Sequence, residues 1–335
     1  KLILNYMKSN QIPGLSISIS YNDSLIYSKG FGYSNIETKS EVTPSKTKFR
    51  IGSITKIITS LTLAKLVDLD SIDLNEKVDY YLDSLPKNKY LFTIKEIGGH
   101  LSGLPKNPNN EKLDCSNSYK RSDLYHQLEK DTLNFSPSLK FQYSNYGFKL
   151  LGLIIEKVFK KPITITHKEL ILDKFDMKNT IPDLGKYDSR TTVFYRKHQD
   201  VLAIAPCQDC TFKHSEGCYL STTEDLIKLG NNLLFNKTFN PITLKLFTSS
   251  QKTKNNTTTN YGIGFVTKKD KFKNFYFGHD GKNIGGSSAL RIYPKSKLVI
   301  SILTNYEYLN FNNILNSIAK SYILEISKHL NSIDE

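Results

Sequence analysis

The sequence predicts an α+β fold in which an antiparallel β-sheet is flanked by N- and C-terminal helices and interrupted by a mostly helical insertion. Three observations predict it. Segments that alternate apolar and polar residues lie near the N-terminus, helical patterns dominate the middle, and β-rich segments with short turns return near the C-terminus. A chain of 335 residues suits one large domain or two closely packed ones.

The N-terminal part supplies a helix and a hairpin. Residues 1–12 have a helical pattern that the Pro-Gly pair at 13–14 stops. Residues 15–21 and 25–29 alternate in polarity, and the Asn-Asp pair at 22–23 lies between them. This arrangement predicts a β-hairpin at the start of a sheet.

The middle of the chain, residues 71–249, is predicted to be the helical insertion. Capping boxes at 93–96 and 221–224 mark the starts of two of its helices. The predicted helices span residues 93–98, 120–131, 147–159, 164–174, 223–235 and 241–248. Residues 107–117 should form a polar loop, and residues 183–218 a long surface loop with short strands, which is often functional.

The C-terminal part returns to strands and ends in an amphipathic helix at 310–331. The predicted strands span residues 261–267, 272–278, 288–293 and 298–304. We expect these four and the two N-terminal strands to form one antiparallel sheet, with both terminal helices and the helix at 53–69 on the same face. Residues 1–70 and 250–335 would form the sheet domain, and its cleft with the insertion at 71–249 is the natural pocket.

The amino-acid composition limits the kinds of partner that the chain can bind. With 39% hydrophobic and 23% charged residues the chain is typical of globular proteins, and no apolar run is long enough to span a membrane. The net charge of +14 fits either attraction to an anionic membrane surface or lysine-rich compositional drift, which scattered lysines favour. The aromatic residues do not interleave with arginines, so no nucleic acid is expected. Because Lys1 opens a helical segment without an initiator Met, we expect a mature or shortened form.

The four cysteines leave three interpretations open. Cys115 stands alone, whereas Cys207, Cys210 and Cys218 cluster around His214. They could form two disulfides, remain free thiols, or bind zinc through a Cys-x2-Cys-x3-His-x3-Cys pattern. We favour disulfides and no metal site. Disulfides indicate an oxidising compartment, so an extracytoplasmic location, secreted or periplasmic, is favoured, and the Asn-x-Ser/Thr sequons are compatible with it.

The first chemical signal is Ser53-x-x-Lys56, at the start of the helix predicted at 53–69, which follows a short strand at 48–51. This helix is apolar almost all round, as expected of a buried helix. Lys56 lies one turn after Ser53 on the same face, and a buried lysine with a lowered pKa can take a serine proton. The pattern alone is weak, because it occurs five times, starting at Ser45, Ser53, Ser84, Ser249 and Ser317.

Two further motifs select this copy. Tyr143-x-Asn145 lies in a loop just before a predicted helix, and His279-x-Gly281 lies at the end of a predicted strand, before a glycine-rich turn. The order is informative: a Ser-x-x-Lys on a buried helix, a Tyr-x-Asn in the helical insertion, then a basic residue on a strand.

This order resembles the serine β-lactamase and penicillin-binding protein family, especially its class C-like, esterase and D-peptidase branch. Residues 99–104 resemble the family's His-x-Ser-Gly-Leu segment, and residues 217–222 its Gly-x-x-Ser-Thr segment. The sequence around Ser53 and the run at 74–78 are most similar to the mitochondrial serine β-lactamase-like proteins of animals and their bacterial relatives. The resemblance covers residues 12–305, nearly the whole chain.

The resemblance implies a serine hydrolase without a cofactor. Ser53 would attack a carbonyl and form an acyl-enzyme, and Lys56 would keep the serine polarised. Tyr143, as a phenolate stabilised by Lys56 and also by His279, would carry a proton to the leaving group and then activate water.

The resemblance also implies the binding groups. Asn145 would orient the lysine or a substrate amide, and His279 and Gly281 would line the substrate site. The backbone N–H groups of Ser53 and Lys282 would form the oxyanion hole.

The chain departs from the family pattern at the third motif. Asp280 replaces the usual Thr or Ser, and Lys282 replaces a small residue. At the pocket rim these charges should alter which substrate fits, and Lys282 would either bind a substrate carboxylate or be solvated. Residues 215–218 replace a run of small residues. These departures disfavour true β-lactamase activity, and His100 is expected to have a structural role in a packed turn.

The leading functional hypothesis is therefore acyl transfer from peptides, particularly those with D- or unusual termini, or from small esters and amides. The alternative is a filament-forming or membrane-associated assembly protein with residual hydrolase activity, and the mitochondrial relatives make that organelle the alternative location. A zinc-organised binding module at 207–218 is a third interpretation.

Overall fold

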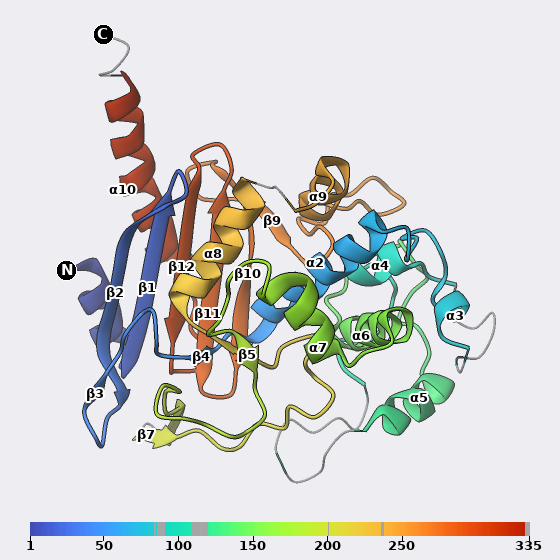
Figure 1. Ribbon diagram of the computed structural model, residues 1–335, viewed down its shortest axis with the longest axis horizontal. Coiled ribbons are helices and arrows are strands. Elements are labelled where there is room, and N and C mark those ends of the chain that lie inside the picture. The colour runs from blue at the N-terminus through green and yellow to red at the C-terminus, as the bar shows by residue number, and fades with distance from the viewer. Residues whose placement is uncertain are drawn as a thin grey trace.

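The computed structural model describes residues 1–83, 85, 91–108, 115, 120–199, 201–235 and 238–331 (Figure 1). The predicted α+β class is confirmed: an antiparallel sheet forms one side of the molecule and most helices of the insertion form the other. The strand order in the seven-stranded sheet is β3-β2-β1-β12-β11-β10-β9. The strands of this sheet are β1 (Gly14–Tyr21), β2 (Ser24–Asn35), β3 (Ser40–Glu41), β9 (Val266–Lys269), β10 (Phe275–Asn283), β11 (Gly286–Tyr293) and β12 (Leu298–Thr304).

The two ends of the chain meet in the middle of this sheet. β1 pairs with β12 in antiparallel register, with Leu15 opposite Thr304, and with β2 on its other side. The predicted joining of two N-terminal and four C-terminal strands is therefore confirmed, and β3 is added at the edge. The strand predicted at 261–267 is shifted, because β9 begins only at Val266. The strand predicted at 272–278 continues to Asn283, so His279 lies inside β10 and not at the end of a strand.

Each face of the sheet is covered by a different set of helices. The terminal helices α1 (Leu2–Asn10) and α10 (Asn312–Asn331) contact each other and share a core with Leu15 and Ile302. On the other face, α8 (Thr223–Leu234) packs on β1 and β12, and α2 (Thr55–Asp68) shares a core with Leu290 and Leu303. The prediction that the Ser53 helix shares a face with the terminal helices is wrong.

The polarity patterns of β1 and α2 do not indicate which face of the sheet α2 covers. Alternate residues of β1 are serines. Ser16 and Ser18 are buried beneath α8, and the hydroxyl of each forms a hydrogen bond with the Thr223 hydroxyl at 2.8 Å. A polar strand face therefore meets a helix and not solvent. Because α2 is apolar all round, nothing in its own pattern indicates which face of the sheet it covers.

The predicted helices of the insertion are found close to their expected positions. They are α4 (Ile94–Gly98), α5 (Arg121–Lys130), α6 (Asn145–Phe159), α7 (Ile163–His167), α8 and α9 (Pro241–Thr248), joined by the unpredicted α3 (Val78–Tyr81). The helix expected at 164–174 is divided, because α7 continues as the π-helical turn η2 (Lys168–Leu172). α8 is capped by Thr222, whose hydroxyl accepts the Asp225 N–H, one residue later than predicted.

The long loop at 183–218 carries a hairpin, β6 (Tyr195–His198) and β7 (Val201–Ile204), as expected. A second small sheet, β4 (Phe49–Arg50), β8 (Tyr219–Ser221) and β5 (Ile181–Pro182), ties that loop to the Ser53 segment. Most of the polar loop expected at 107–117 lies outside the described residues.

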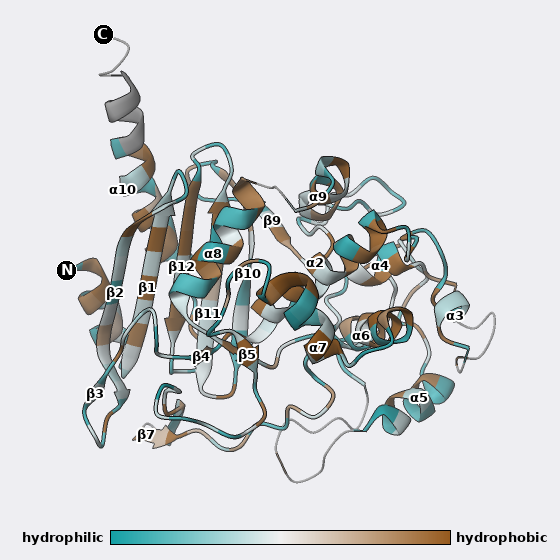
Figure 2. Cartoon of the chain, in the orientation of Figure 1, coloured by the Kyte–Doolittle hydropathy of each residue, from teal (hydrophilic) through white to brown (hydrophobic). Residues whose placement is uncertain are grey.

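One hydrophobic core runs from the α8 face of the sheet through α2 into α6. Figure 2 shows more hydrophobic residues on α6, inside the helical half, than on α5 at its edge. The division into a discontinuous sheet domain and an inserted domain stays a prediction. Among the described residues, no helix combines the length and apolar character needed to cross a membrane.

Candidate active site

Ser53 lies where the small sheet passes into the buried helix. It sits in a single 3-10 turn, η1 (Gly52–Ile54), between β4 (Phe49–Arg50) and α2, and not in the first turn of the α-helix as expected. Gly52 has a φ of 50°, in the left-handed region that favours glycine. A Cβ atom at Gly52 would lie 2.7 Å from the Lys282 nitrogen. The turn thus needs glycine both for its conformation and for its close approach to β10.

Lys56 is fully buried on α2 and its Nζ contacts three oxygen atoms. They are Ser53 Oγ at 3.2 Å, Asn145 Oδ1 at 2.8 Å and the Glu216 carbonyl at 2.8 Å. Burial lowers the pKa of Lys56 to about 7, although the Glu216 carboxylate acts in the opposite direction. A neutral amine keeps two N–H donors for the amide and the carbonyl, and its lone pair is then left for the serine hydroxyl.

Tyr143 contacts the same serine from the insertion. Its hydroxyl donates to Ser53 Oγ at 2.8 Å, and the Lys56 Nζ lies 5.0 Å from the centre of its ring. Burial raises the pKa of Tyr143 well above its ordinary value. Burial therefore favours the neutral phenol, which can donate a proton, over the phenolate expected from the sequence.

The loop that carries Tyr143 is held on both sides. The Asn145 Nδ2 donates to Asn107 Oδ1 at 2.8 Å, which turns the Asn145 carbonyl oxygen toward the lysine. His100 Nδ1 accepts the Ser144 N–H at 3.1 Å, and its ring centre lies 4.3 Å from that of Tyr143. His100 is completely buried, and burial lowers its pKa well below the ordinary value. Its contacts position the tyrosine loop.

His279 lines the opposite wall but makes its hydrogen bonds elsewhere. Nδ1 lies 2.6 Å from the Asp280 carbonyl, which can only accept, so Nδ1 carries the proton. Nε2 then accepts from the Tyr261 hydroxyl at 2.9 Å. Burial lowers the pKa of His279 to about 4, and its ring centre is 6.1 Å from that of Tyr143. His279 is neutral near pH 7 and supplies no charge to the tyrosine.

Asp280 lines the cavity as expected, but its carboxylate has a protein partner. Its carboxylate pairs with Arg291 Nη1 at 2.7 Å, and Arg291 also contacts Asn312 on α10. Because successive side chains on a strand point to opposite faces, Asp280 points toward the terminal helices while His279 points toward the pocket. Because Asp280 also lines the cavity, the substrate selection expected of it stays a prediction.

The rest of the third motif brings β10 against the serine turn. A Cβ atom at Gly281 would lie 2.0 Å from the Ile51 carbonyl oxygen, which also accepts the Ser288 hydroxyl at 2.7 Å. Gly281 is therefore required by close packing. Lys282 follows it, with its backbone nitrogen beside the turn and an exposed side chain.

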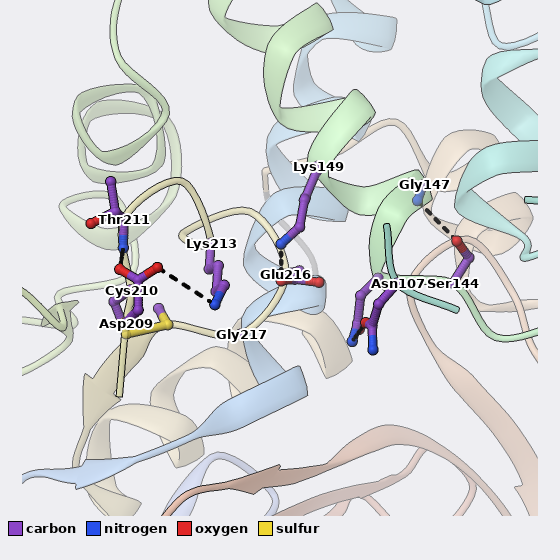
Figure 3. Close-up of polar contacts among 12 residues, drawn as sticks. Asn107, Ser144, Gly147, Lys149, Asp209, Cys210, Thr211, Lys213, Glu216 and Gly217 are labelled. Atoms are coloured by element: carbon purple, nitrogen blue, oxygen red, sulfur yellow. Dashed lines mark hydrogen bonds and ion pairs between the residues drawn. A yellow bond between two sulfur atoms is a disulfide. The ribbon is translucent and has the colours of Figure 1, made fainter. Parts of the chain in front are cut away.

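These groups line a cavity of about 440 Å³. Ser53, Tyr143, Asn145 and His279 lie in its wall, together with Lys106, Asp280, Lys282 and several residues of the segment 208–218. Figure 3 shows part of this segment, with Lys213 joined to Asp209 and Lys149 of α6 reaching Glu216.

The cysteines are paired in two disulfides, Cys115–Cys207 and Cys210–Cys218. The free-thiol and zinc interpretations are wrong. Within the described ranges there is no group of three or more His, Cys, Asp or Glu side chains that could hold a metal. His214 instead donates from Nε2 to the Asp183 carbonyl at 3.1 Å.

Three further residues of this site belong to none of the predicted motifs. Tyr261 bonds His279, Asn107 orients Asn145, and Lys149 pairs with Glu216 beneath the lysine of the first motif. No short motif includes them, because each lies on a different element from its partner. Only the fold brings them together.

The α+β fold thus brings Lys56 and Tyr143 into contact with one serine hydroxyl beside the start of a buried helix, an arrangement suited to nucleophilic catalysis. Residues 1–322 match the family described as Beta-lactamase. The chain belongs to this family.

Two relatives illustrate the similarity. The chain is 28% identical over 346 residues to Protein flp of Staphylococcus aureus (strain NCTC 8325 / PS 47), covering 99% of this chain and 65% of that protein. It is 24% identical to the human serine beta-lactamase-like protein LACTB, mitochondrial, covering 94% of this chain and 77% of that protein. The chain thus spans somewhat less than two thirds of the flp relatives that it matches.

Two solved structures share the fold. The octameric penicillin-binding protein homologue from Pyrococcus abyssi superposes with a TM-score of 0.79 at 24% identity, covering 90% of this chain and 72% of that chain. A D-stereospecific amidohydrolase from Streptomyces sp. superposes with a TM-score of 0.77 at 19% identity, covering 91% and 92%.

Proposed function

We propose that this hydrolase forms an acyl-enzyme on Ser53 and acts on peptides or small amides, with small esters as alternative substrates. The observation that carries the proposal is the contact of one serine oxygen with both Lys56 Nζ and Tyr143 Oη, in the wall of a cavity. One neighbour can take the serine proton and the other can give a proton, which is what acyl transfer needs.

In the acylation step neutral Lys56 accepts the hydroxyl proton while Ser53 Oγ bonds to the substrate carbonyl carbon. Collapse of the tetrahedral intermediate breaks the bond to the leaving group, which takes a proton from the Tyr143 hydroxyl. The Lys56 ammonium then returns a proton toward Tyr143. Hydrolysis of the ester repeats the sequence with water as the nucleophile, so the enzyme is regenerated.

The oxyanion hole is assigned to the backbone N–H groups of Ser53 and Lys282. The support is the close approach of Gly52, the residue before Ser53, to the Lys282 nitrogen. Fixed amide dipoles at this place would stabilise the negative oxygen of the tetrahedral intermediate.

The rim of the cavity favours an anionic substrate. Lys106 and Lys282 are exposed at the cavity, and among the described residues neither forms an ion pair. The substrate class that fits is a peptide or amide with a carboxylate near the reacting carbonyl. The fold shared with a D-stereospecific amidohydrolase is compatible with peptides that contain D-residues.

A second function is assembly. The shared fold of an octameric homologue favours self-assembly, and a net charge of +14 would favour contact with an anionic membrane surface. The two disulfides support an extracytoplasmic location, whereas the mitochondrial human relative supports the alternative. Solution size would test the assembly hypothesis.

A covalent probe tests the hydrolase proposal. The protein is treated with a fluorophosphonate, and the adduct is located by mass spectrometry. We expect labelling at Ser53 that is absent from Ser53→Ala and slower in Tyr143→Phe. A folded protein that forms no adduct, or forms it elsewhere, would overturn the proposal.

A further inference from the structure

A short closed loop separates the cavity at Ser53 from a second cavity. The Cys210–Cys218 disulfide closes the loop, which contributes Glu216 to the first cavity. The second cavity, of about 220 Å³, is lined by Lys149 and Ser215 among others. We call this loop, residues 210–218, the wall between the two cavities. The position of the wall sets the direction of its backbone carbonyl groups.

Two side chains of α2 hold this wall by successive carbonyl groups. The Thr59 hydroxyl donates to the Ser215 carbonyl at 2.7 Å, and Lys56 Nζ donates to the Glu216 carbonyl at 2.8 Å. The second contact is one of the three that fix the Lys56 amine beside Ser53. A shift of the wall would therefore move an acceptor away from this lysine.

The Glu216 side chain anchors the same residue from the other side. Its carboxylate pairs with Lys149 Nζ of α6, as Figure 3 shows. The Lys149 side chain is 0% exposed and the Glu216 side chain 8% exposed, so both charges are removed from water. A charge in such a place needs its partner, because an unpaired buried ion is strongly unfavourable.

We propose that the Lys149–Glu216 ion pair is a positioning device for the catalytic lysine. The pair keeps the Glu216 carbonyl oxygen within hydrogen-bond distance of Lys56 Nζ. Its negative and positive charges also act on the Lys56 amine in opposite directions. Lys149 and Glu216 are thus positioning residues, and neither contacts the substrate's reacting atoms. The inference rests on the proposed acyl transfer by Ser53.

The two charges act on Lys56 in opposite directions. The Glu216 carboxylate raises the pKa of Lys56, and the Lys149 ammonium lowers it, as Lys106 also does. The other titratable groups that face Lys56 are His100, Tyr143 and His279. These three residues are kept in every variant, so the sign of the change in the Lys56 pKa reports which charge of the pair was removed.

The test measures the rate of fluorophosphonate labelling at Ser53 against pH. In this reaction Ser53 Oγ bonds to phosphorus, fluoride leaves, and the serine proton passes to neutral Lys56, so the rate rises as Lys56 loses its proton. We expect Glu216→Gln to move this rise to lower pH and Lys149→Met to move it to higher pH, each by roughly half a unit or more. The double variant should return close to the wild-type position.

The controls separate positioning from general damage. Lys48→Met removes another buried lysine from an ion pair, with Asp188, outside the cavity, and should leave the pH dependence unchanged. Circular dichroism checks folding. If Lys149→Met does not fold, Glu216→Gln should still move the rise to lower pH while the double variant keeps the wild-type position.

The possible results differ in what they overturn. Wild-type protein that is not labelled at Ser53 overturns the proposed function, and this inference with it. Wild-type labelling with the expected rise, but with variants that do not move it or move it in the same direction, overturns only the inference.

Discussion

Lys56 and Lys149 are two fully buried lysines on neighbouring helices, and both contact Glu216. Their partners differ. Lys149 meets the carboxylate, whereas Lys56 meets a peptide carbonyl, an amide oxygen and a hydroxyl. An opposite charge in contact favours the ammonium, while burial among neutral groups favours the amine. The chemical partner of a buried lysine, and not its burial alone, therefore separates a candidate base from a structural cation.

The largest expected effect is on catalysis at Lys56. Lys56→Met removes the base and should slow labelling of Ser53 by roughly 10²- to 10⁴-fold. Lys56→Arg should lose as much, because a guanidinium keeps its charge and cannot take the serine proton. Stopped-flow or gel-based labelling rates measure both. An arginine variant that stays within ten-fold of wild type would show that only the positive charge matters.

Stability should respond to the two lysines with opposite signs. The folded-state pKa of Lys56, about 7, lies below the ordinary lysine value of 10.5, so between these values the unfolded chain binds more protons. Lys56 therefore destabilises the fold at low pH, and this penalty disappears as the pH rises toward 10.5.

We expect Lys56→Met to raise the free energy of unfolding by about 2 kcal/mol or more at pH 6, with less gain at pH 9. Lys149→Met should lower it by about 3–5 kcal/mol, because Glu216 is left as an unpaired buried charge. Urea unfolding at both pH values measures the changes. If both variants changed the free energy of unfolding in the same direction, the distinction between a neutral Lys56 and a charged Lys149 would be contradicted.

Tyr143→Phe should have a smaller effect, of a different kind. Removal of the hydroxyl that donates to Ser53 Oγ should slow amide turnover by roughly 10²-fold, because the leaving group loses its proton donor. Its pH dependence should stay at the wild-type position, since Tyr143 is a neutral phenol. If the rise of turnover with pH disappeared in this variant, the titrating base would instead be the tyrosine.

The smallest effects belong to the exposed lysines at the rim. Lys282→Met and Lys106→Met should each lower kcat/KM for a substrate with a carboxylate by roughly two- to five-fold, with little change for a neutral ester. Added salt should reduce the difference by screening. A similar loss with both substrates would assign these side chains to packing or to chemistry.

Much of the fold could be predicted because it depends on local patterns. The helix at Ile94–Gly98 has the expected capping box of Thr93 and Glu96, and the alternation in β1 and β12 predicts their place in a sheet. The face covered by α2 could not be predicted, because its uniform hydrophobicity carries no direction.

The candidate site divides in the same way. Ser53, Lys56, Tyr143 and Asn145 stand in recognisable motifs, and the structure brings them into contact. The direction of Asp280 was missed because β10 continues past His279, and strand alternation then points its carboxylate to the opposite face.

The central claim is that Lys56 is the buried lysine whose amine is available near neutral pH. Titration of the protein carrying ¹³C-labelled lysine side chains, followed by NMR, tests it most directly, with Lys56→Met to assign the signal. We expect one lysine signal to titrate near pH 7 and to be missing from the variant. If every lysine signal titrates near the ordinary value of 10.5, the account of Ser53 activation is contradicted.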